Sequence, residues 1–330
     1  MTSSNIKTLI IGCGNIAGGF DINKSDWPST HIGAYKHHGK FDINACVEPN
    51  KKIRAEFASR WNINNAFSTI QEVIANGLNF DVISICSSTS SHHINVFEAL
   101  KLKPKVIFCE KPLASNYKDA LEIIEMCKNN NIKLAVNYSR RWDPKVVELR
   151  NEITSGKFGE ISSVICYYNK GVLNNGSHMI DLLLNLLGSL QIVTAISPIN
   201  DYSIDDPTLS ALLKTNSGLP IHLVATNANE YSLFELEIFG SKKSIKMRDG
   251  GLNWSSRTII EDSRFEGYKN LSKDQYTEGR YQEAMTRAVE NIYNVIKYDD
   301  ELLCTGQEAC EAHKICCDLK ETALLDSNSR

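Results

Sequence analysis

The first third of the chain alternates short apolar runs with segments in which apolar residues recur every three or four positions. This alternation predicts βαβ units, in which helices connect parallel strands and cover both faces of the sheet. The run 82–86 (Val-Ile-Ser-Ile-Cys) has apolar residues at both odd and even positions, which point to opposite faces of a strand, as expected of a strand covered on both faces. The expected strands are 8–11, 43–47, 81–86, 105–109 and 133–137, and the expected helices are 51–61, 70–75, 92–102 and 117–129.

The pattern changes after about residue 140. A helix at 144–154, a strand at 161–168 and a helix at 177–187 are followed to about residue 265 by consecutive strands with turn residues between them. Two helices, 276–297 and 307–325, are expected to close the chain. The predicted fold is therefore α/β, with a doubly wound parallel sheet in a domain at 1–140. A second, α+β domain at 141–330 would contain an open, mostly antiparallel sheet and the closing helices at 276–325.

The first predicted strand runs into Gly12-Cys13-Gly14-Asn15-Ile16-Ala17, which reads G-x-G-x-x-A. Gly12 permits the tight turn, Gly14 lets the backbone approach a pyrophosphate, and Ala17 allows the following helix to pack closely on the sheet. Asn15 and Ile16 would open that helix, whose free N–H groups bind phosphate. Because the motif lies in the first turn of a βαβ pattern, it predicts a Rossmann domain that binds a dinucleotide.

Glu48 ends the second predicted strand. A carboxylate there would accept hydrogen bonds from the adenosine ribose and repel a 2′-phosphate, which favours NAD(H) over NADP(H). The alternative is a solvated strand end. Glu48 lies 31 positions after Ala17 (48 − 17), which is longer than the usual ~20, so we expect an extra loop at 21–30.

The charge balance excludes some classes of function. The chain has 36 Lys and Arg against 39 Asp and Glu, a formal net charge of −3, which argues against a large nucleic-acid or membrane-surface footprint. No apolar run approaches the ~20 residues of a membrane span. The sequence opens without a secretion signal, and most of its ten cysteines lie in apolar runs. We therefore expect a reduced, cytoplasmic protein that binds neither nucleic acid nor membrane.

The C-terminal segment offers one set of potential metal ligands: Cys310, His313, Cys316 and Cys317. A tetrahedral site is usually built on Cys pairs in turns, and no C-x2-C occurs here. We expect an ordinary helix with an apolar stripe and no metal.

A resemblance to a known family rests on several segments together. Glu110-Lys111-Pro112 follows the fifth predicted strand, and Gly176-Ser177-His178-Met179-Ile180-Asp181 follows some 65 residues later. With the glycine motif and the segments 87–92, 137–142 and 305–309, the chain resembles the Gfo/Idh/MocA family over nearly its whole length.

The resemblance implies a two-domain NAD(P)-dependent oxidoreductase that acts on a sugar or a sugar-like polyol. The second domain would close the substrate pocket and often builds contacts of a homo-oligomer, a dimer or tetramer. Lys111 matches the family's active-site lysine, His178 its catalytic histidine, and Glu110 would lie near the nicotinamide. Other residues expected at the cofactor are Ser87, Ser88 and His92, and at the substrate Asn174, Asp181, Arg141 and Lys170.

One departure concerns Asn174, where many members carry Asp four residues before the histidine. An amide cannot exchange a proton near neutral pH, so Asn174 could only orient the substrate. The proton transfer would fall to His178, which we favour as the acid/base, or to Lys111, which could instead polarise the substrate oxygen. Arg141 and Lys170 suit an anionic group such as that of a nucleotide-linked sugar, although Arg141 could equally form a structural ion pair.

Two alternatives for the function stay open. Tightly held NAD could support transient oxidation and re-reduction, which would give an epimerase or a transhydrogenase without net redox change. The same fold could also serve as a non-catalytic NAD-binding regulator, a reading that only Asn174 supports.

Overall fold

The structure is a computed structural model that describes residues 5–22 and 26–328. The chain divides into two compact units, Met1–Trp142 with Gln282–Cys310, and Asp143–Tyr281 with Glu311–Arg330. The division into domains at residue 140 stays a prediction, and the two units differ from it in placing 282–310 with the N-terminal part.

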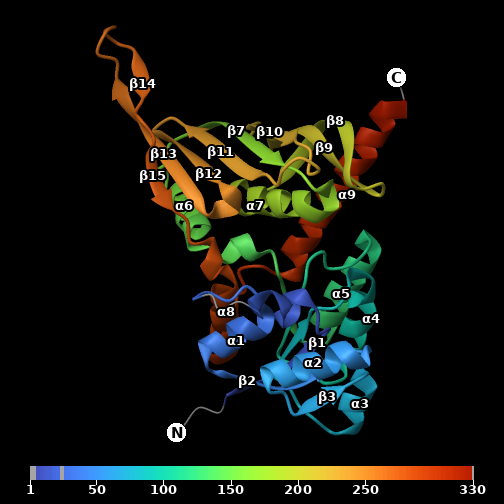
Figure 1. The fold of residues 1–330 in the computed structure, drawn as a ribbon. Coiled ribbons are helices and arrows are strands. Elements are labelled where there is room, and N and C mark those ends of the chain that lie inside the picture. The colour runs from blue at the N-terminus through green and yellow to red at the C-terminus, as the bar shows by residue number, and fades with distance from the viewer. Residues whose placement is uncertain (1–4, 23–25, 329–330) are drawn as a thin grey trace. The chain divides into compact units, whose positions relative to one another are not determined.

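The first unit is built on a parallel sheet of six strands among the described residues, in the order β3-β2-β1-β4-β5-β6. The strands are β1 (Ile6–Ile11), β2 (Phe41–Val47), β3 (Asn65–Phe67), β4 (Val82–Ile85), β5 (Val106–Cys109) and β6 (Lys133–Val136). The connecting helices include α2 (Lys51–Trp61), α3 (Ile70–Ala75), α4 (Thr89–Leu100) and α5 (Tyr117–Asn129) (Figure 1). Every residue of β4 and β5 is buried, as the continuous apolar runs predicted.

The segment after the glycine motif differs from the prediction. A π-helical turn, η1 (Asn15–Gly19), and a 3-10 turn, η2 (Phe20–Ile22), stand where a regular helix was expected. An unpredicted helix, α1 (His31–His38), follows. Residues 23–25 of the predicted loop at 21–30 lie outside the described residues. The Asp21 carboxylate accepts hydrogen bonds from Ser29 and Thr30 and so fixes the start of α1.

The helix expected at 276–297 was wrong in its first third, at residues 276–283. Residues Gln275–Glu278 form strand β15, which pairs with β13, and helix α8 spans Ala284–Tyr298. Gly279 separates the strand from the helix, and ladder hydrogen bonds to β13 override the helical pattern around Tyr276. A 3-10 turn, η3 (Ser139–Trp142), contacts α8 through the Trp142 indole, which donates to Asn291 at 3.1 Å.

The second unit carries a nine-stranded sheet in the described part of the chain, of order β14-β13-β12-β11-β7-β10-β9-β8 with β15 beside β13. Its pairs are antiparallel except β7 with β10, which confirms the mostly antiparallel prediction. The strands are β7 (Ile161–Tyr168), β8 (Leu190–Ser203), β9 (Asp206–Thr215), β10 (Pro220–Ala225), β11 (Phe234–Gly240), β12 (Lys243–Arg248), β13 (Asn253–Glu261), β14 (Lys269–Leu271) and β15 (Gln275–Glu278).

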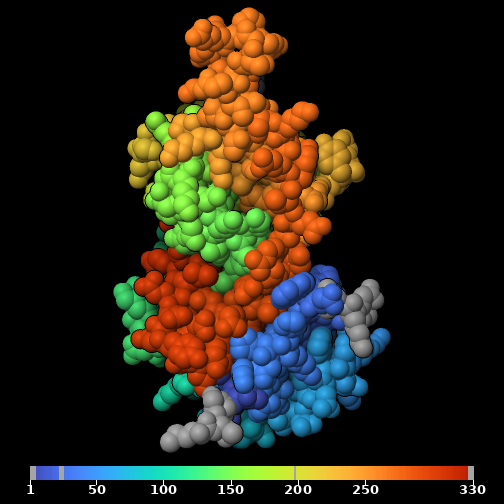
Figure 2. Space-filling view, turned by 90° about the vertical axis from the view of Figure 1, so that its left-hand side faces the viewer, coloured from blue at the N-terminus to red at the C-terminus, as the bar shows by residue number. Residues whose placement is uncertain are grey.

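Helices cover one face of this sheet, and one hairpin extends from it. Helices α6 (Pro144–Thr154) and α7 (Ser177–Leu187) lie along the sheet, and α7 buries Met179, Leu182 and Leu183 (Figure 1). The hairpin of β13 and β14 projects beyond the other strands (Figures 1 and 2). None of the helices described is both long and apolar enough to cross a membrane.

The last helix, α9 (Gly306–Asn328), contains the four potential metal ligands of the C-terminal segment. It buries Ala309, Ala312, Ile315, Cys316 and Leu319, which is the apolar stripe that the sequence predicted. His313 is also buried, and this burial lowers the pKa of its imidazole.

Candidate functional site

The glycine motif forms a tight turn at the carboxyl end of β1. Gly12 has a φ of +87°, and its N–H donates to the Val47 carbonyl at 2.8 Å. A Cβ on Gly12 would lie 2.6 Å from the backbone nitrogen of Ser87, so only glycine fits between β1 and the turn after β4. The backbone thus brings the two turns that the sequence assigned to the cofactor close together.

Gly14 is exposed, and a Cβ there would meet nothing within 4 Å. The protein itself therefore leaves space above this backbone, which is the space that a pyrophosphate needs in a Rossmann domain. The next residues, Asn15 and Ile16, lie in η1 with their side chains exposed and half-buried, and Ala17 is fully buried beneath them.

Glu48 stands at the end of β2 with its carboxylate turned toward the motif. Its Oε2 accepts the backbone N–H of Cys13 at 3.1 Å, and its Oε1 accepts that of Asn50 at 3.0 Å. These two hydrogen bonds hold the carboxylate at the rim of the cofactor turn, where the sequence predicted contact with the adenosine ribose.

A cavity of about 480 Å³ opens at the carboxyl ends of β1, β2 and β4. Open α/β sheets bind ligands at this edge. No lysine or arginine belongs to its lining, as far as the described residues go. The lining comprises Ile11, Gly12, Gly14, Val47, Glu48, Pro49, Ser68, Thr69, Ile70, Gln71, Cys86, Ser87, Ser88, Ser91, Ile94, Asn95 and Glu98.

Several lining residues were missed from the sequence. Ser68 to Gln71 come from the turn between β3 and α3, and β3 is only three residues long, too short to recognise. Asn95 donates to the Ser87 hydroxyl at 2.8 Å and holds that side chain at the cavity. Asn95 could have been found, because it lies one helical turn after Ser91 on the predicted helix.

His92 has a different position from the one expected of a cofactor contact. Its imidazole is buried, with Nδ1 3.0 Å from the Pro112 carbonyl oxygen and Nε2 3.0 Å from the Ser87 carbonyl oxygen. Both ring nitrogens therefore face the backbone. His92 connects the Ser87 turn to the segment after Lys111 and does not belong to the cavity lining.

Glu110 and Lys111 follow β5 at the same edge of the sheet. The Glu110 side chain is 12% exposed, and its Oε1 accepts hydrogen bonds from His31 at 2.8 Å and Asn137 at 2.6 Å. Burial alone would raise the pKa of Glu110, but these bonds and the nearby charges of His31 and Lys111 outweigh it, so that the pKa lies below its usual value. Glu110 therefore carries a negative charge beside the half-buried Lys111.

In the second unit, His178 is the second residue of α7 and is half-buried. It follows η4, a π-helical turn at Gly171–Gly176 that contains Asn174. The Ser177 hydroxyl donates to the Asn174 carbonyl at 2.9 Å and joins the turn to the helix. Asp181, expected at the substrate, is 1% exposed inside this unit.

Two buried aspartates hold the turn before His178. Asp206 accepts the N–H groups of Leu173 and Asn174 at 2.7 and 2.9 Å. Asp201 accepts the N–H of Lys170 at 3.0 Å and the Thr208 hydroxyl at 2.6 Å. Burial acts to raise the pKa of Asp201, but these hydrogen bonds hold it below its ordinary value.

The two basic residues expected at the substrate differ in exposure. Arg141 is 4% exposed, and its guanidinium lies 2.6 Å from the Glu308 carboxylate. This geometry favours the structural ion pair that the sequence left open as an alternative. Lys170 is exposed, and its φ of +70° places it in the left-handed region directly before η4.

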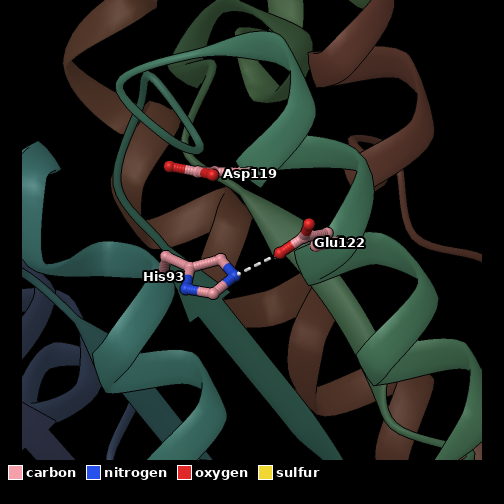
Figure 3. Close-up of side chains that lie close together, drawn as sticks. All are labelled: His93, Asp119 and Glu122. Atoms are coloured by element: carbon pink, nitrogen blue, oxygen red, sulfur yellow. Dashed lines mark hydrogen bonds and ion pairs between the residues drawn. The ribbon is translucent and has the colours of Figure 1, made fainter.

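One group of potential metal ligands, His93, Asp119 and Glu122, occurs among the described residues on α4 and α5 (Figure 3). His93 Nε2 lies 3.0 Å from Glu122, and Asp119 accepts a hydrogen bond from Asn116 at 2.8 Å. Because these side chains are exposed or half-exposed and pair with one another, we interpret them as surface ion pairs.

The fold and the cavity define the class of protein: a nucleotide-dependent oxidoreductase with a Rossmann domain. Residues 6–138 match the oxidoreductase family with the NAD-binding Rossmann fold, and residues 167–317 match the C-terminal alpha/beta domain of the same family. The chain belongs to this family, Gfo/Idh/MocA, and is an oxidoreductase with an NAD-binding Rossmann domain.

Named relatives and solved structures agree with this assignment. The chain is 23% identical over 262 residues to inositol 2-dehydrogenase of Rhizobium meliloti, covering 73% of this chain and 78% of that protein. An NAD binding oxidoreductase from Klebsiella pneumoniae superposes with a TM-score of 0.81 at 15% identity, covering 98% and 97% of the two chains. The WlbA dehydrogenase from Bordetella pertussis, solved with NADH and UDP-GlcNAcA, gives a TM-score of 0.75 at 18% identity, with 97% of each chain covered.

Proposed function

We propose that this enzyme transfers a hydride between NAD and a secondary hydroxyl of a sugar or cyclitol, with Lys111 and His178 as its catalytic residues. The observation that carries the proposal is the cavity at the carboxyl edge of the parallel sheet, which the glycine motif and Glu48 line and which lies at the same edge as Lys111. His178 lies within residues 167–317, which match the family's C-terminal domain, and this supports a role for it in the second unit.

The chemistry needs a base and a positive charge. Bound at the cavity that the glycine motif and Glu48 line, NAD⁺ would supply the acceptor for the hydride of the carbinol carbon, and the hydroxyl proton would go to a base of the protein, so that a ketone would result. His178 serves as the base, since an imidazole titrates near neutral pH. Lys111 stabilises the negative charge that develops on the oxygen.

Glu48 supports the preference for NAD over NADP. Its carboxylate is fixed at the cavity rim, where a 2′-phosphate would meet its negative charge, and the lining contributes no basic side chain among its described residues. The nearby Arg54 guanidinium lies outside the lining and is held by the carbonyls of Glu48 and Pro49. Both observations favour a nicotinamide cofactor without the 2′-phosphate.

For the substrate we favour a neutral polyol over a nucleotide-linked sugar. Arg141 was one reason to expect an anionic group, and it is buried against Glu308. Of these two basic residues, Lys170 is exposed and Arg141 is not. The name of the Rhizobium relative, an inositol dehydrogenase, agrees with a neutral ring, whereas WlbA was solved with a nucleotide sugar.

The test is a spectrophotometric screen for NADH formation from inositols, free aldoses and nucleotide-sugars. Lys111→Ala should abolish turnover and leave NADH binding, measured by fluorescence, within about threefold. Turnover at the wild-type rate in this variant would remove Lys111 from the mechanism. Wild-type protein that converts a sugar without added NAD⁺, and that retains nucleotide on purification, would establish the epimerase or transhydrogenase alternative instead. A protein that binds NADH and converts none of these compounds would favour the regulator.

We also propose that the enzyme is a cytoplasmic homo-oligomer, a dimer or tetramer. The second unit leaves large apolar side chains exposed on its sheet and hairpin, including Ile204 at 82%, Phe265 at 58% and Tyr268 at 68%. The rings of Phe265 and Tyr268 lie in contact, with their centroids 5.9 Å apart, and contiguous exposed apolar surface of this kind marks protein contacts. Light scattering coupled to gel filtration tests the proposal, and a monomer at micromolar concentration would refute it.

A further inference from the structure

A row of three buried side chains, Tyr35, Ser84 and His31, leads to the carboxylate of Glu110. The Tyr35 hydroxyl lies 2.8 Å from the Ser84 hydroxyl, which lies 3.2 Å from His31 Nδ1. His31 Nε2 then lies 2.8 Å from Glu110 Oε1. Tyr35, Ser84 and His31 are each 0% exposed. None of them belongs to a motif that the sequence singled out.

The chemistry of the carboxylate assigns one direction in this row. An ionised carboxylate only accepts hydrogen bonds, so His31 must carry a proton on Nε2 and donate it to Glu110. The Nδ1 atom of His31 pairs with the Ser84 hydroxyl, and that hydroxyl pairs with the Tyr35 hydroxyl; a hydroxyl can donate or accept in such a pair. Each of these polar groups therefore has a partner, as expected of a buried polar network.

The network determines the surroundings of the Glu110 charge. Asn137, which follows β6, donates the second hydrogen bond to Oε1. The other titratable groups that interact with Glu110 are Lys111, the thiol of Cys86 and the thiol of Cys109. Burial and the Glu110 charge raise the pKa of both thiols well above its usual value, so the thiols stay neutral, and Lys111 contributes a positive charge that acts on this carboxylate.

We propose that His31 is a positioning residue that holds Glu110 as a carboxylate beside Lys111, so that Lys111 acts as an ammonium and not as the base. The attraction between Lys111 and Glu110 is mutual, and it stabilises the protonated amine as well as the carboxylate. The inference rests on the proposed function: with Lys111 held as an ammonium, the hydroxyl proton goes to His178 and the hydride to NAD⁺.

A pair of amide substitutions separates this role from plain support of the fold. In His31→Gln, the side-chain amide nitrogen occupies the place of Nε2 and can still donate to Glu110. In His31→Asn, the shorter amide occupies the place of Nδ1, keeps a partner in Ser84 and loses the bond to Glu110. Both variants bury one amide in place of one imidazole, so they form a matched pair.

We expect His31→Asn to lower kcat about 10- to 100-fold, the scale of a misplaced catalytic group, with NADH affinity within about threefold of wild type. Without the His31 donor, burial raises the pKa of Glu110, so the acidic limb of the pH–kcat profile should move to higher pH. His31→Gln should keep kcat within about threefold and leave that limb in place. His37→Gln, an exposed position on the same helix, is the control.

Equal kcat losses and unshifted acidic limbs in both amide variants would overturn the proposal. If His31→Asn does not fold, the isosteric variant Glu110→Gln tests the proposal instead. A wild-type kcat in Glu110→Gln would show that the reaction does not need the carboxylate, and it would overturn the proposal. Infrared difference spectra between pH 7 and pH 5 provide a readout that does not need turnover. A carboxylic acid band that appears in His31→Asn, is absent in wild type and disappears on adding Glu110→Gln would support the proposal, and its absence would refute it. The proposed function fails separately, through an active Lys111→Ala or an inactive wild type.

Discussion

Two glycines of one motif should respond in opposite ways to the same added methyl group. Gly14 has a φ of −80°, which any residue adopts, and its Cβ would meet nothing within 4 Å. Gly12 has a φ of +87°, and its Cβ would lie 2.6 Å from the backbone nitrogen of Ser87. Alanine therefore fits the protein at Gly14 and does not fit it at Gly12.

The magnitudes follow from these contacts. Gly14→Ala should leave the free energy of unfolding unchanged or raise it by about 0.5 kcal/mol, since it restricts the unfolded chain without strain. When NAD is bound, the methyl group occupies the space of the pyrophosphate, and overpacking of this kind costs about 1–3 kcal/mol. The expected rise in the Kd for NADH is therefore roughly 5- to 150-fold.

Gly12→Ala should instead damage the fold. A left-handed backbone costs a residue with a Cβ about 1–2 kcal/mol, and the clash with backbone atoms adds about 1–3 kcal/mol. Thermal unfolding and NADH fluorescence titration of both variants measure the two effects. The reasoning is refuted if Gly14→Ala binds NADH with wild-type affinity, or if it lowers Tm as much as Gly12→Ala does.

Three further predictions use the same assays. Glu48→Gln should raise the affinity for NADPH relative to NADH roughly tenfold, about 1.4 kcal/mol, because a neutral amide no longer repels the 2′-phosphate; an unchanged ratio would contradict the role of Glu48. Asp206→Asn replaces one of two acceptor oxygens below η4, so it should destabilise the protein by about 1–3 kcal/mol and lower kcat without changing NADH affinity; an equal loss of NADH binding would argue against a local effect. The pKa values of Glu110 and Asp201 lie below the ordinary 4.5 and 3.8, so their contribution to stability is fully present above those ordinary values and is lost as the pH falls through the lowered values of the folded protein; Tm measured against pH should show a shallower acid loss in Glu110→Gln than in wild type.

The features that the sequence predicted correctly are those that local chemistry determines. The glycine motif could be recognised from its own residue types. The positive φ at residue 12 favours glycine, and the buried position of Ala17 requires a small side chain. Glu48 was found because a strand end is visible as the last residue of an apolar run. Both features depend on a few neighbouring residues, so the sequence alone was enough to place them.

The missed elements lack such a local signal. Helix α1 buries five consecutive residues, His31 to Tyr35, and exposes most of the others, so it has no apolar stripe of helical period. Its partner Glu110 lies 79 positions further along the chain. The hydrogen bond between them exists only because the sheet order places β1 beside β4 and β4 beside β5. Tertiary contacts of this kind leave no periodic pattern in either segment.

In both units, carboxylates with little exposure accept several hydrogen bonds, and these bonds offset the cost of removing the charges from water. An isolated buried carboxylate costs several kcal/mol, yet Glu110, Asp201 and Asp206 each accept at least two hydrogen bonds at 2.6–3.0 Å. Each of these bonds fixes a segment that carries a proposed catalytic residue, Lys111 in one unit and His178 in the other. Acceptors satisfied before substrate arrives need no rearrangement during the reaction, which is the condition for electrostatic stabilisation of a transition state. Loss of one donor should therefore reduce kcat more than it reduces the affinity for NADH.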